Sequence, residues 1–414
     1  MRIRSFAILV LALATTVAAC GRGTSEPTAA AGAASEPPGL LVVSRADASI
    51  FTMKPDGSGR TDLVEERSEL VAIQPTWSPE GARLVWTEVD HMNEVPEVFI
   101  VISGPGGEEL DRIPAPVAPF YYYWSPAGDQ VAFLAGGPAG RVDLGILDGD
   151  LRFLGAARPY YFAWAPDGRR LLTHTDLDTV ALLGTNGTAT TLDRTEARFQ
   201  APQWAADGTR LVYATGSPPP EGGIRIGAFQ ANSQEIVVTD TEGAVLHRIG
   251  AFAGVATFEL SPDGRQIAHS VTFDRETFNF GPLVVTDLNS GEEETVSQRP
   301  VLAYQWSPAG DGLLYLEGED GIDHPRFRWA VWDGEVSTEY AMVTPTTSFA
   351  TSYLPFWDQY SRSHTLWAPD GSAFTYAGLD EQGEPAVWVQ TIGSDSGPRR
   401  IASGDVVFWS PQSG

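Results

Sequence analysis

The stretch AWAPDGRRLLT, residues 163–173, decides the fold because it recurs along the chain. It joins a tryptophan, a Pro-Asp-Gly turn and an apolar segment that favours a β-strand. Related segments carry the lead residues Trp77, Trp124, Trp164, Trp204, Leu260, Trp306, Trp367 and Trp409, which are separated by 47, 40, 40, 56, 46, 61 and 42 residues. A period just above 40 residues predicts the four-stranded blades of a β-propeller.

The aspartate of this turn invites a chemical interpretation, because Asp167 lies beside two arginines and could be a catalytic carboxylate or a metal ligand. The residue is kept as Asp167, Asp207, Asp263 and Asp370, whereas Glu80, Ala127, Ala309 and Gln412 replace it in the other copies. A chemical role would not tolerate alanine. A tight turn tolerates alanine at this position, since Pro166 suits the first central position of the turn and Gly168 can adopt the left-handed conformation. We therefore predict a structural role for Asp167.

Eight further glycine-containing turns alternate along the chain with the tryptophan motifs. Examples are MKPDGSG at 53–59 and GTNGT at 184–188. The two chain ends complement each other: LLVVS, SIFTM and TDLVE lack a preceding tryptophan motif, and the final VVFWSP lacks following strands. Joined, they would complete one blade and leave no exposed sheet edge. The sequence therefore predicts an all-β protein, a propeller of eight four-stranded blades closed by its N- and C-terminal strands.

These motifs resemble the TolB-type, WD40-like propeller repeats, and the resemblance covers residues 40–414. Its core, Trp-Ser/Ala-Pro-Asp-Gly before an apolar strand, is more specific for the fold than for function. The resemblance implies any of three protein classes, because such repeats occur in binding proteins, in the propeller domains of prolyl-peptidase-like enzymes and in some lyases.

The N-terminus predicts export. Residues 1–19 combine early arginines, a short apolar run and small residues, as in a secretory signal peptide. The tail VAAC resembles a bacterial lipoprotein signal, which implies lipidation of Cys20, although an ordinary signal peptide with an incidental cysteine is the alternative. Residues 20–39 are rich in Gly, Ala, Ser and Pro and predict a disordered tether before a single propeller domain at 40–414. We expect an extracytoplasmic monomer that contacts a bacterial membrane only through lipidated Cys20.

The formal net charge of −26 argues against nucleic-acid partners, because binding to phosphates needs clustered Lys and Arg. With Cys20 the only cysteine, an internal disulfide is excluded.

The sequence offers little for catalysis or cofactors. It has no G-x-S-x-G nucleophile motif, and its six histidines include no metal-type pair. His269 takes a packing position that is aromatic in most blades, and His91, His324 and His364 lie in loops. Glu317, Glu319, Asp320 and Asp323 form an acidic loop that could hold calcium or simply be solvated. We predict no cofactor, no metal and no catalytic residue.

Loop length points to a binding face. In a four-stranded blade, the first and third turns share one face, so the long loops 87–97, 214–234, 317–327 and 344–365 gather on the other. There the candidate binding residues are Phe356, Trp357, Asp358, Gln359 and Tyr360, with Tyr121 and Tyr160 from two tyrosine-rich connections. Exposed aromatic clusters suit contacts with proteins and sugars, whereas the alternative is that these rings pack between blades.

The expected function is therefore non-catalytic binding of a protein or an envelope glycan at the long-loop face. The alternative is a lyase-like propeller enzyme that acts on polysaccharide with loop histidines and acids. A purely structural envelope component is a third possibility.

Overall fold

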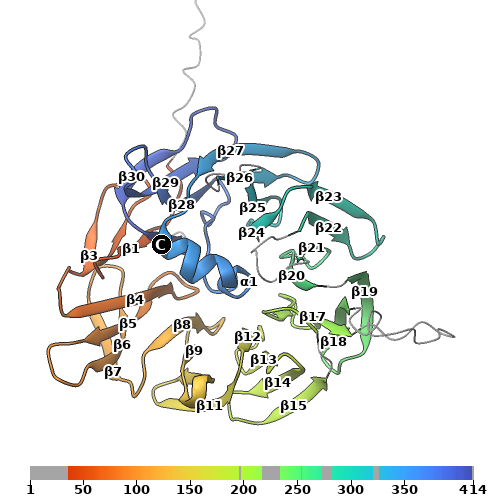
Figure 1. Ribbon diagram of the computed structural model, residues 1–414, viewed down its shortest axis with the longest axis horizontal. Coiled ribbons are helices and arrows are strands. Elements are labelled where there is room, and N and C mark those ends of the chain that lie inside the picture. Colours follow the sequence, from red (N-terminus) through yellow and green to blue (C-terminus); the bar gives the residue numbers. More distant parts are fainter. Residues whose placement is uncertain are drawn as a thin grey trace, which may run out of the picture. The chain divides into compact units, whose positions relative to one another are not determined.

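The computed structural model describes residues 36–194, 197–216, 234–252, 254–272, 281–319 and 326–412. Eight antiparallel sheets surround a common axis as the blades of a propeller (Figure 1). This confirms the predicted fold class. The predicted signal peptide, Cys20, most of the tether, His324, Asp320 and Asp323 lie outside the described residues.

The strands follow one another blade by blade. Blade 1 holds β4 (Leu70–Trp77), β5 (Leu84–Asp90), β6 (Glu97–Ser103) and β7 (Glu109–Pro114), and blade 2 holds β8 (Pro119–Trp124), β9 (Val131–Gly136), β10 (Val142–Leu147) and β11 (Leu151–Ala157). Blade 3 holds β12 (Tyr160–Trp164), β13 (Arg170–Thr175), β14 (Thr179–Gly184) and β15 (Ala189–Asp193), and blade 4 holds β16 (Gln203–Trp204), β17 (Arg210–Gly216), β18 (Gln234–Asp240) and β19 (Val245–Phe252). Blade 5 holds β20 (Val255–Leu260), β21 (Gln266–Thr272), β22 (Leu283–Asp287) and β23 (Glu293–Ser297), and blade 6 holds β24 (Val301–Trp306), β25 (Leu313–Gly318), β26 (Phe327–Trp332) and β27 (Ser337–Val343). Blade 7 holds β28 (Ala373–Leu379), β29 (Pro385–Thr391) and β30 (Arg399–Ser403), and blade 8 combines β31 (Val406–Trp409) with β1 (Leu41–Ser44), β2 (Ile50–Met53) and β3 (Thr61–Val64). The helices are η1 (Pro138–Gly140), η2 (Phe349–Tyr353), η3 (Leu354–Phe356) and α1 (Trp357–Tyr360).

The first strand of each complete blade lies nearest the axis, and the later strands follow outward (Figure 1). Blade 8 closes the ring as predicted, because β31 supplies its inner strand and pairs antiparallel with β1, Leu41 opposite Trp409. Blade 7 has three strands, and its inner segment is reduced to isolated bridges from Thr365 to Trp409 and from Trp367 to Phe374.

The Pro-Asp-Gly segments form the predicted turns. Gly168 has a φ of 66°, and its N–H donates to the Ala165 carbonyl at 2.9 Å. The Asp167 carboxylate accepts the N–H of Arg169 at 2.9 Å, and the same bond to the residue two positions on recurs at Asp207, Asp263 and Asp370. The structural role predicted for Asp167 is confirmed.

The lead tryptophans join neighbouring blades. The indole N–H of Trp164 donates to the carbonyl of Tyr123, the residue just before the lead tryptophan of the preceding blade, at 2.9 Å. The same bond recurs from Trp124 to Thr76, from Trp306 to Glu259 and from Trp367 to Gln305. The indole N–H groups of Trp77 and Trp204 are buried without a partner. The repeated tryptophan therefore both fills the core and ties one inner strand to the next.

This difference predicts unequal effects of the same substitution. Both Trp164 and Trp204 are buried, but only Trp164 donates a bond, so Trp164→Phe should lower the free energy of unfolding more than Trp204→Phe does, by about 1–2 kcal/mol. Urea denaturation of the two variants measures the difference. Equal losses would contradict a stabilising role for the interblade bond.

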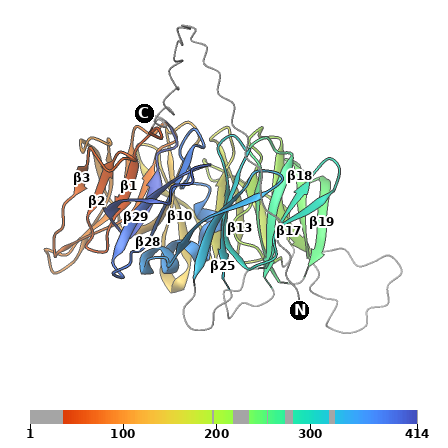
Figure 2. The same cartoon turned by 90° about the horizontal axis from the view of Figure 1, so that it is seen from above.

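The antiparallel blades give the ring two distinct faces. The turns after the first and third strands of each blade lie on one face, the short-turn face, and the remaining connections lie on the opposite, long-loop face. The described chain begins at the short-turn face, where Glu36 pairs with Arg399 at 2.7 Å and the Pro38 carbonyl accepts the Trp409 indole N–H at 2.8 Å. Figure 2 shows the ring from the side. Within the described residues, none of the helices has the length and apolarity needed to cross a bilayer.

Candidate functional site

Residues 346–364, which we call the plug, connect β27 to blade 7 and carry α1 into the middle of the ring (Figure 1). Phe349, Tyr353, Trp357 and Tyr360 recur at helical spacing, and each is only 4% exposed. The rings of Tyr353 and Tyr360 pack with centroids 4.5 Å apart, and Tyr353 also contacts Phe408 of blade 8 at 5.2 Å. The aromatic stripe is therefore the apolar core between the plug and the inner strands.

Polar plug side chains bind the backbone of the inner strands. The Gln359 amide accepts the N–H of Phe162 at 3.0 Å and donates to its carbonyl at 2.8 Å and to the Tyr121 hydroxyl at 2.9 Å. The Trp357 indole donates to the Tyr304 carbonyl at 3.0 Å, and Asp358 accepts the N–H of Ala201 at 3.0 Å. These contacts satisfy edge groups on blades 3, 4 and 6 that would otherwise be buried without partners.

The prediction that the candidate binding residues are exposed is wrong for all but one of them. Trp357, Asp358, Gln359, Tyr360, Tyr121 and Tyr160 are at most 9% exposed, whereas Phe356 is 42% exposed. The reason is the position of the 344–365 connection, which turns into the ring instead of standing on its rim. The alternative that these rings are packing residues agrees with their burial, and a binding role for them stays a prediction.

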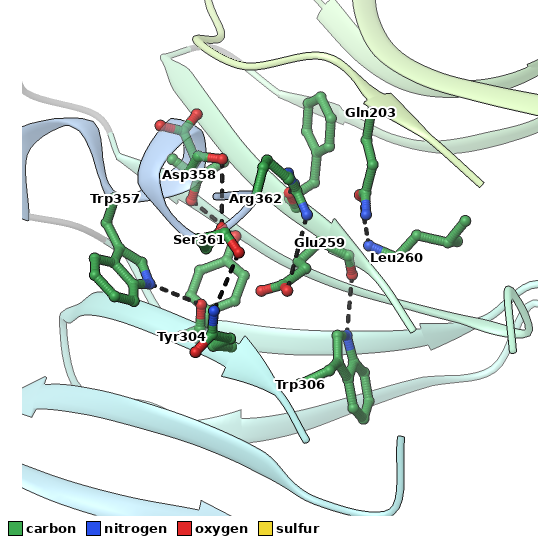
Figure 3. A network of polar contacts seen from close by, with 12 residues as sticks. Gln203, Glu259, Leu260, Tyr304, Trp306, Trp357, Asp358, Ser361 and Arg362 are labelled. Atoms are coloured by element: carbon green, nitrogen blue, oxygen red, sulfur yellow. Dashed lines mark hydrogen bonds and ion pairs between the residues drawn. The ribbon is translucent and has the colours of Figure 1, made fainter. Parts of the chain in front are cut away.

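A cluster of ionisable groups lies where the plug meets blade 5 (Figure 3). Arg362 of the plug lies 3.8 Å from Glu259 and donates to the Phe258 carbonyl at 2.8 Å. Burial raises the pKa of Glu259 to about 7 and that of Asp358 to about 6, and the charge of Arg362 opposes both shifts. One Glu259 oxygen, Oε2, has no hydrogen-bond partner. The adjoining cavity of about 20 Å³ can hold one water molecule.

The raised pKa of Glu259 predicts a pH-dependent stability. The unfolded carboxyl ionises near pH 4.5 and the folded one near 7, so the folded state binds more protons between these values and its stability falls as the pH rises through them. Glu259→Gln removes this titration. Urea unfolding from pH 4.5 to 8 should shift in favour of the variant, relative to the wild-type protein, by at most about 1.4 kcal/mol per pH unit. A constant difference across this range would contradict the raised pKa.

The long-loop face also holds a pocket of about 540 Å³ beside the plug. It is lined by residues 44–48 of blade 8, residues 66–68 and 70–74 of blade 1, Ser348, Ser352 and Tyr353 of the plug, and Asp405 and Val406. This volume lies in the range of small-molecule and peptide-fragment sites. The lining carries both signs of charge, with Arg45, Arg67, Asp47, Glu66 and Asp405.

Gln74 is the unusual residue of this pocket. It lies in a β-bulge of β4 between Ile73 and Thr76, and its φ of 63° is a left-handed conformation that a side chain disfavours. The residue is 9% exposed, and its amide oxygen Oε1 is buried without a hydrogen-bond partner, although its side chain also lies against the Tyr360 hydroxyl of the plug. Ala48 across the pocket has a φ of 68°, so two of its lining residues are strained. Strain and an unpaired buried acceptor are both features that gather at binding sites.

Sequence reasoning missed this pocket because its walls come from four separate segments of the chain. One local signal was present: the Gln-Pro pair in LVAIQPTW interrupts the alternation of a strand, and a proline inside an inner strand indicates a bulge. The helical spacing of Phe349, Tyr353 and Trp357 likewise indicated a helix within the loop.

The other chemical candidates have ordinary contacts. His364 is buried in the plug, where burial lowers its pKa to about 3, and its ring lies 3.3 Å from the Thr76 hydroxyl. His91 is exposed. In the acidic loop, Glu317 pairs with Arg299 at 2.9 Å and Glu319 with Arg328 at 3.1 Å. Across the described ranges, no group of three or more His, Cys, Asp and Glu side chains could hold a metal ion.

Comparisons with known proteins identify the fold alone. Neither a protein-family profile nor a curated protein matches the sequence. Among solved structures, the dihydro-heme d1 dehydrogenase NirN in complex with DHE has a TM-score of 0.55 at 14% identity, over 92% of this chain and 77% of that chain. The β-propeller domain of the Trilobed protease from Pyrococcus furiosus, described as having an open velcro topology, has a TM-score of 0.50 at 12% identity, over 82% and 99%. TolB from Acinetobacter baumannii has a TM-score of 0.40 at 15% identity, over 80% and 83%.

At these low identities, the likeness to the propeller domain of the Trilobed protease bears on the fold alone. A TolB-type lipoprotein stays a prediction.

Proposed function

We propose that this protein is a membrane-anchored, extracytoplasmic binding scaffold that holds a protein or glycan of the bacterial envelope at its long-loop face. The observation that carries the proposal is the pocket of about 540 Å³ on that face, with the buried, unpaired amide oxygen of Gln74 in its wall. A buried acceptor without a partner costs about 1–3 kcal/mol, and a ligand toward which the Gln74 side chain turned, and which donated a hydrogen bond to it, would remove this cost.

The surroundings of the pocket support a binding role. Val71 of its lining is 40% exposed, and Phe356 of the plug is 42% exposed. Arg67 and Glu66 are also exposed, so the face offers apolar and charged contacts together. Ala72 and Gln74 belong to a blade strand and Tyr353 to the buried plug, so this part of the wall is formed before binding, which lowers the entropy lost.

The test compares matched variants on the two faces. The full chain, purified in detergent, is incubated with solubilised native envelope, and the captured components are identified. Arg67→Glu with Phe356→Ala should abolish capture, whereas the short-turn-face pair Arg169→Glu with Val336→Ala should retain it; all four residues are exposed, so thermal unfolding should change little. Retention of capture by the long-loop-face variant contradicts the proposal.

A further inference from the structure

The edge of β4 that faces the pocket has unused backbone groups. The His91 N–H donates to the Glu69 carbonyl, which makes Glu69 and His91 a hydrogen-bonded pair. In an antiparallel ladder every second pair is of this kind, so the pairs of Val71 with Val89 and of Ile73 with Thr87 are also hydrogen-bonded between β4 and β5. Val71 and Ile73 therefore direct their N–H and C=O groups toward β5, and Ala72 directs its own away from β5, toward the pocket that it lines. Within the described part of the chain, neither group of Ala72 has a hydrogen-bond partner.

The plug shows what binds such an edge elsewhere in the ring. Two residues before the lead residue, the carbonyls of Phe162, Phe258 and Tyr304 accept bonds from Gln359, Arg362 and Trp357 respectively. At Phe162 the Gln359 amide meets both backbone groups, as a donor and as an acceptor. Of the three groups, only the amide meets both the N–H and the C=O of one inner-strand residue. On β4, no described plug side chain donates to or accepts from Ala72.

We propose that the pocket binds an extended peptide segment of a partner protein, which adds to the free edge of β4. One peptide residue would accept the N–H of Ala72 and donate its own N–H to the Ala72 carbonyl, and the buried Gln74 side chain would turn toward the peptide so that Oε1 accepts a further N–H. This inference rests on the proposed function and specifies its ligand. Main-chain bonds of this kind supply affinity, and alternate side chains supply specificity.

The lining favours a peptide over a glycan. Its one aromatic residue, Tyr353, is 4% exposed, so the described pocket presents no open ring on which a sugar could stack. The charges are mixed, with Arg45 and Arg67 beside Asp47, Glu66 and Asp405. Such a lining suits a segment with acidic and basic side chains rather than a polyanion.

The test begins with an unbiased selection of random dodecapeptides displayed on phage against the immobilised full chain. The enriched peptide is synthesised with a fluorescent label, and its Kd is measured by anisotropy. Ala72→Pro removes an N–H that β5 does not use, so it should weaken binding at least about tenfold while leaving the sheet paired. Gln74→Leu should weaken binding by a similar factor, whereas Gln382→Leu, an exposed control, should leave the Kd unchanged.

A second measurement needs no variant and covers the case in which Ala72→Pro fails to fold. Singly N-methylated versions of the peptide should lose binding only at the one or two positions whose N–H groups donate to Ala72 and Gln74, because the neighbouring amides of an added strand face away from β4. Failure to enrich any peptide, or a Kd that neither Gln74→Leu nor methylation changes, overturns the inference. Envelope oligosaccharides that bind the wild-type protein but not Gln74→Leu also overturn it, and leave the proposed binding function standing. If the protein bound no peptide and the long-loop-face variant also retained envelope capture, both this inference and the proposed function would be contradicted.

Discussion

Replacing Arg362 with methionine is expected to lower the free energy of unfolding by about 3–5 kcal/mol at pH 8, since it leaves buried carboxyls without their cation. Arg362 lies 3.8 Å from Glu259, and its charge also lowers the pKa of Asp358. At pH 8 the variant must either bury these charges unpaired or take up protons from a basic solution. At pH 5 protonation is easy, so the loss should be much smaller.

The pH dependence distinguishes this electrostatic effect from lost packing, which would be similar at both values. Chemical denaturation at pH 5 and pH 8 provides the measurement. Arg265→Met is the matched control, because Arg265 forms a surface pair with Asp263 at 3.6 Å and its side chain is 74% exposed. The control should change stability by less than about 1 kcal/mol at either pH. A pH-independent loss in Arg362→Met would show that burial, and not charge, sets the role of this arginine.

Gln359→Leu is expected to destabilise the protein by about 3–5 kcal/mol, with little dependence on pH. Leucine has a similar size, but it leaves the buried N–H and C=O of Phe162 without the bonds that the Gln359 amide supplies, whereas the Tyr121 hydroxyl keeps its bond to the backbone carbonyl of residue 359. Each unsatisfied buried group costs about 1–3 kcal/mol, which is why the effect of one side chain is large.

The control for this second variant is Gln382→Leu in the exposed turn between β28 and β29. Gln359→Glu adds a diagnostic step, because its carboxylate can accept the Phe162 N–H but, when ionised, cannot donate to the carbonyl. It should therefore remain destabilised even though its shape is unchanged. Similar urea midpoints for Gln359→Leu and the control would mean that the plug is not held by these bonds.

The propeller itself could be predicted because its signals are local and repeated. A tryptophan, a Pro-Asp-Gly turn and an apolar strand each follow from the conformational preferences of a few adjacent residues, and repetition removes the ambiguity of a single copy such as Asp167. Closure of the ring could also be predicted, since the unmatched segments at 41–64 and 406–409 complement each other.

The site could not be predicted in the same way. The burial of Trp357 and Tyr360 depends on where a connection runs in space. The spacing of the aromatic residues predicts a helix, but it does not predict which surface of the ring that helix covers. The pocket depends on still more distant segments, because Ala48, Gln74, Ser348 and Asp405 meet only after the ring has closed. The two strained residues, Ala48 and Gln74, lie where local preference is overruled by this assembly.

The attachment of the first described residues at Arg399 and Trp409 has a consequence for orientation. If Cys20 carries a lipid, the chain between it and Glu36 extends at most about 53 Å, and it joins the ring on the side opposite the pocket. Such an attachment would let the short-turn face approach the bilayer more closely than the mouth of the pocket does. A soluble protein, or an arm of a neighbouring envelope protein, would then reach the pocket from the aqueous space.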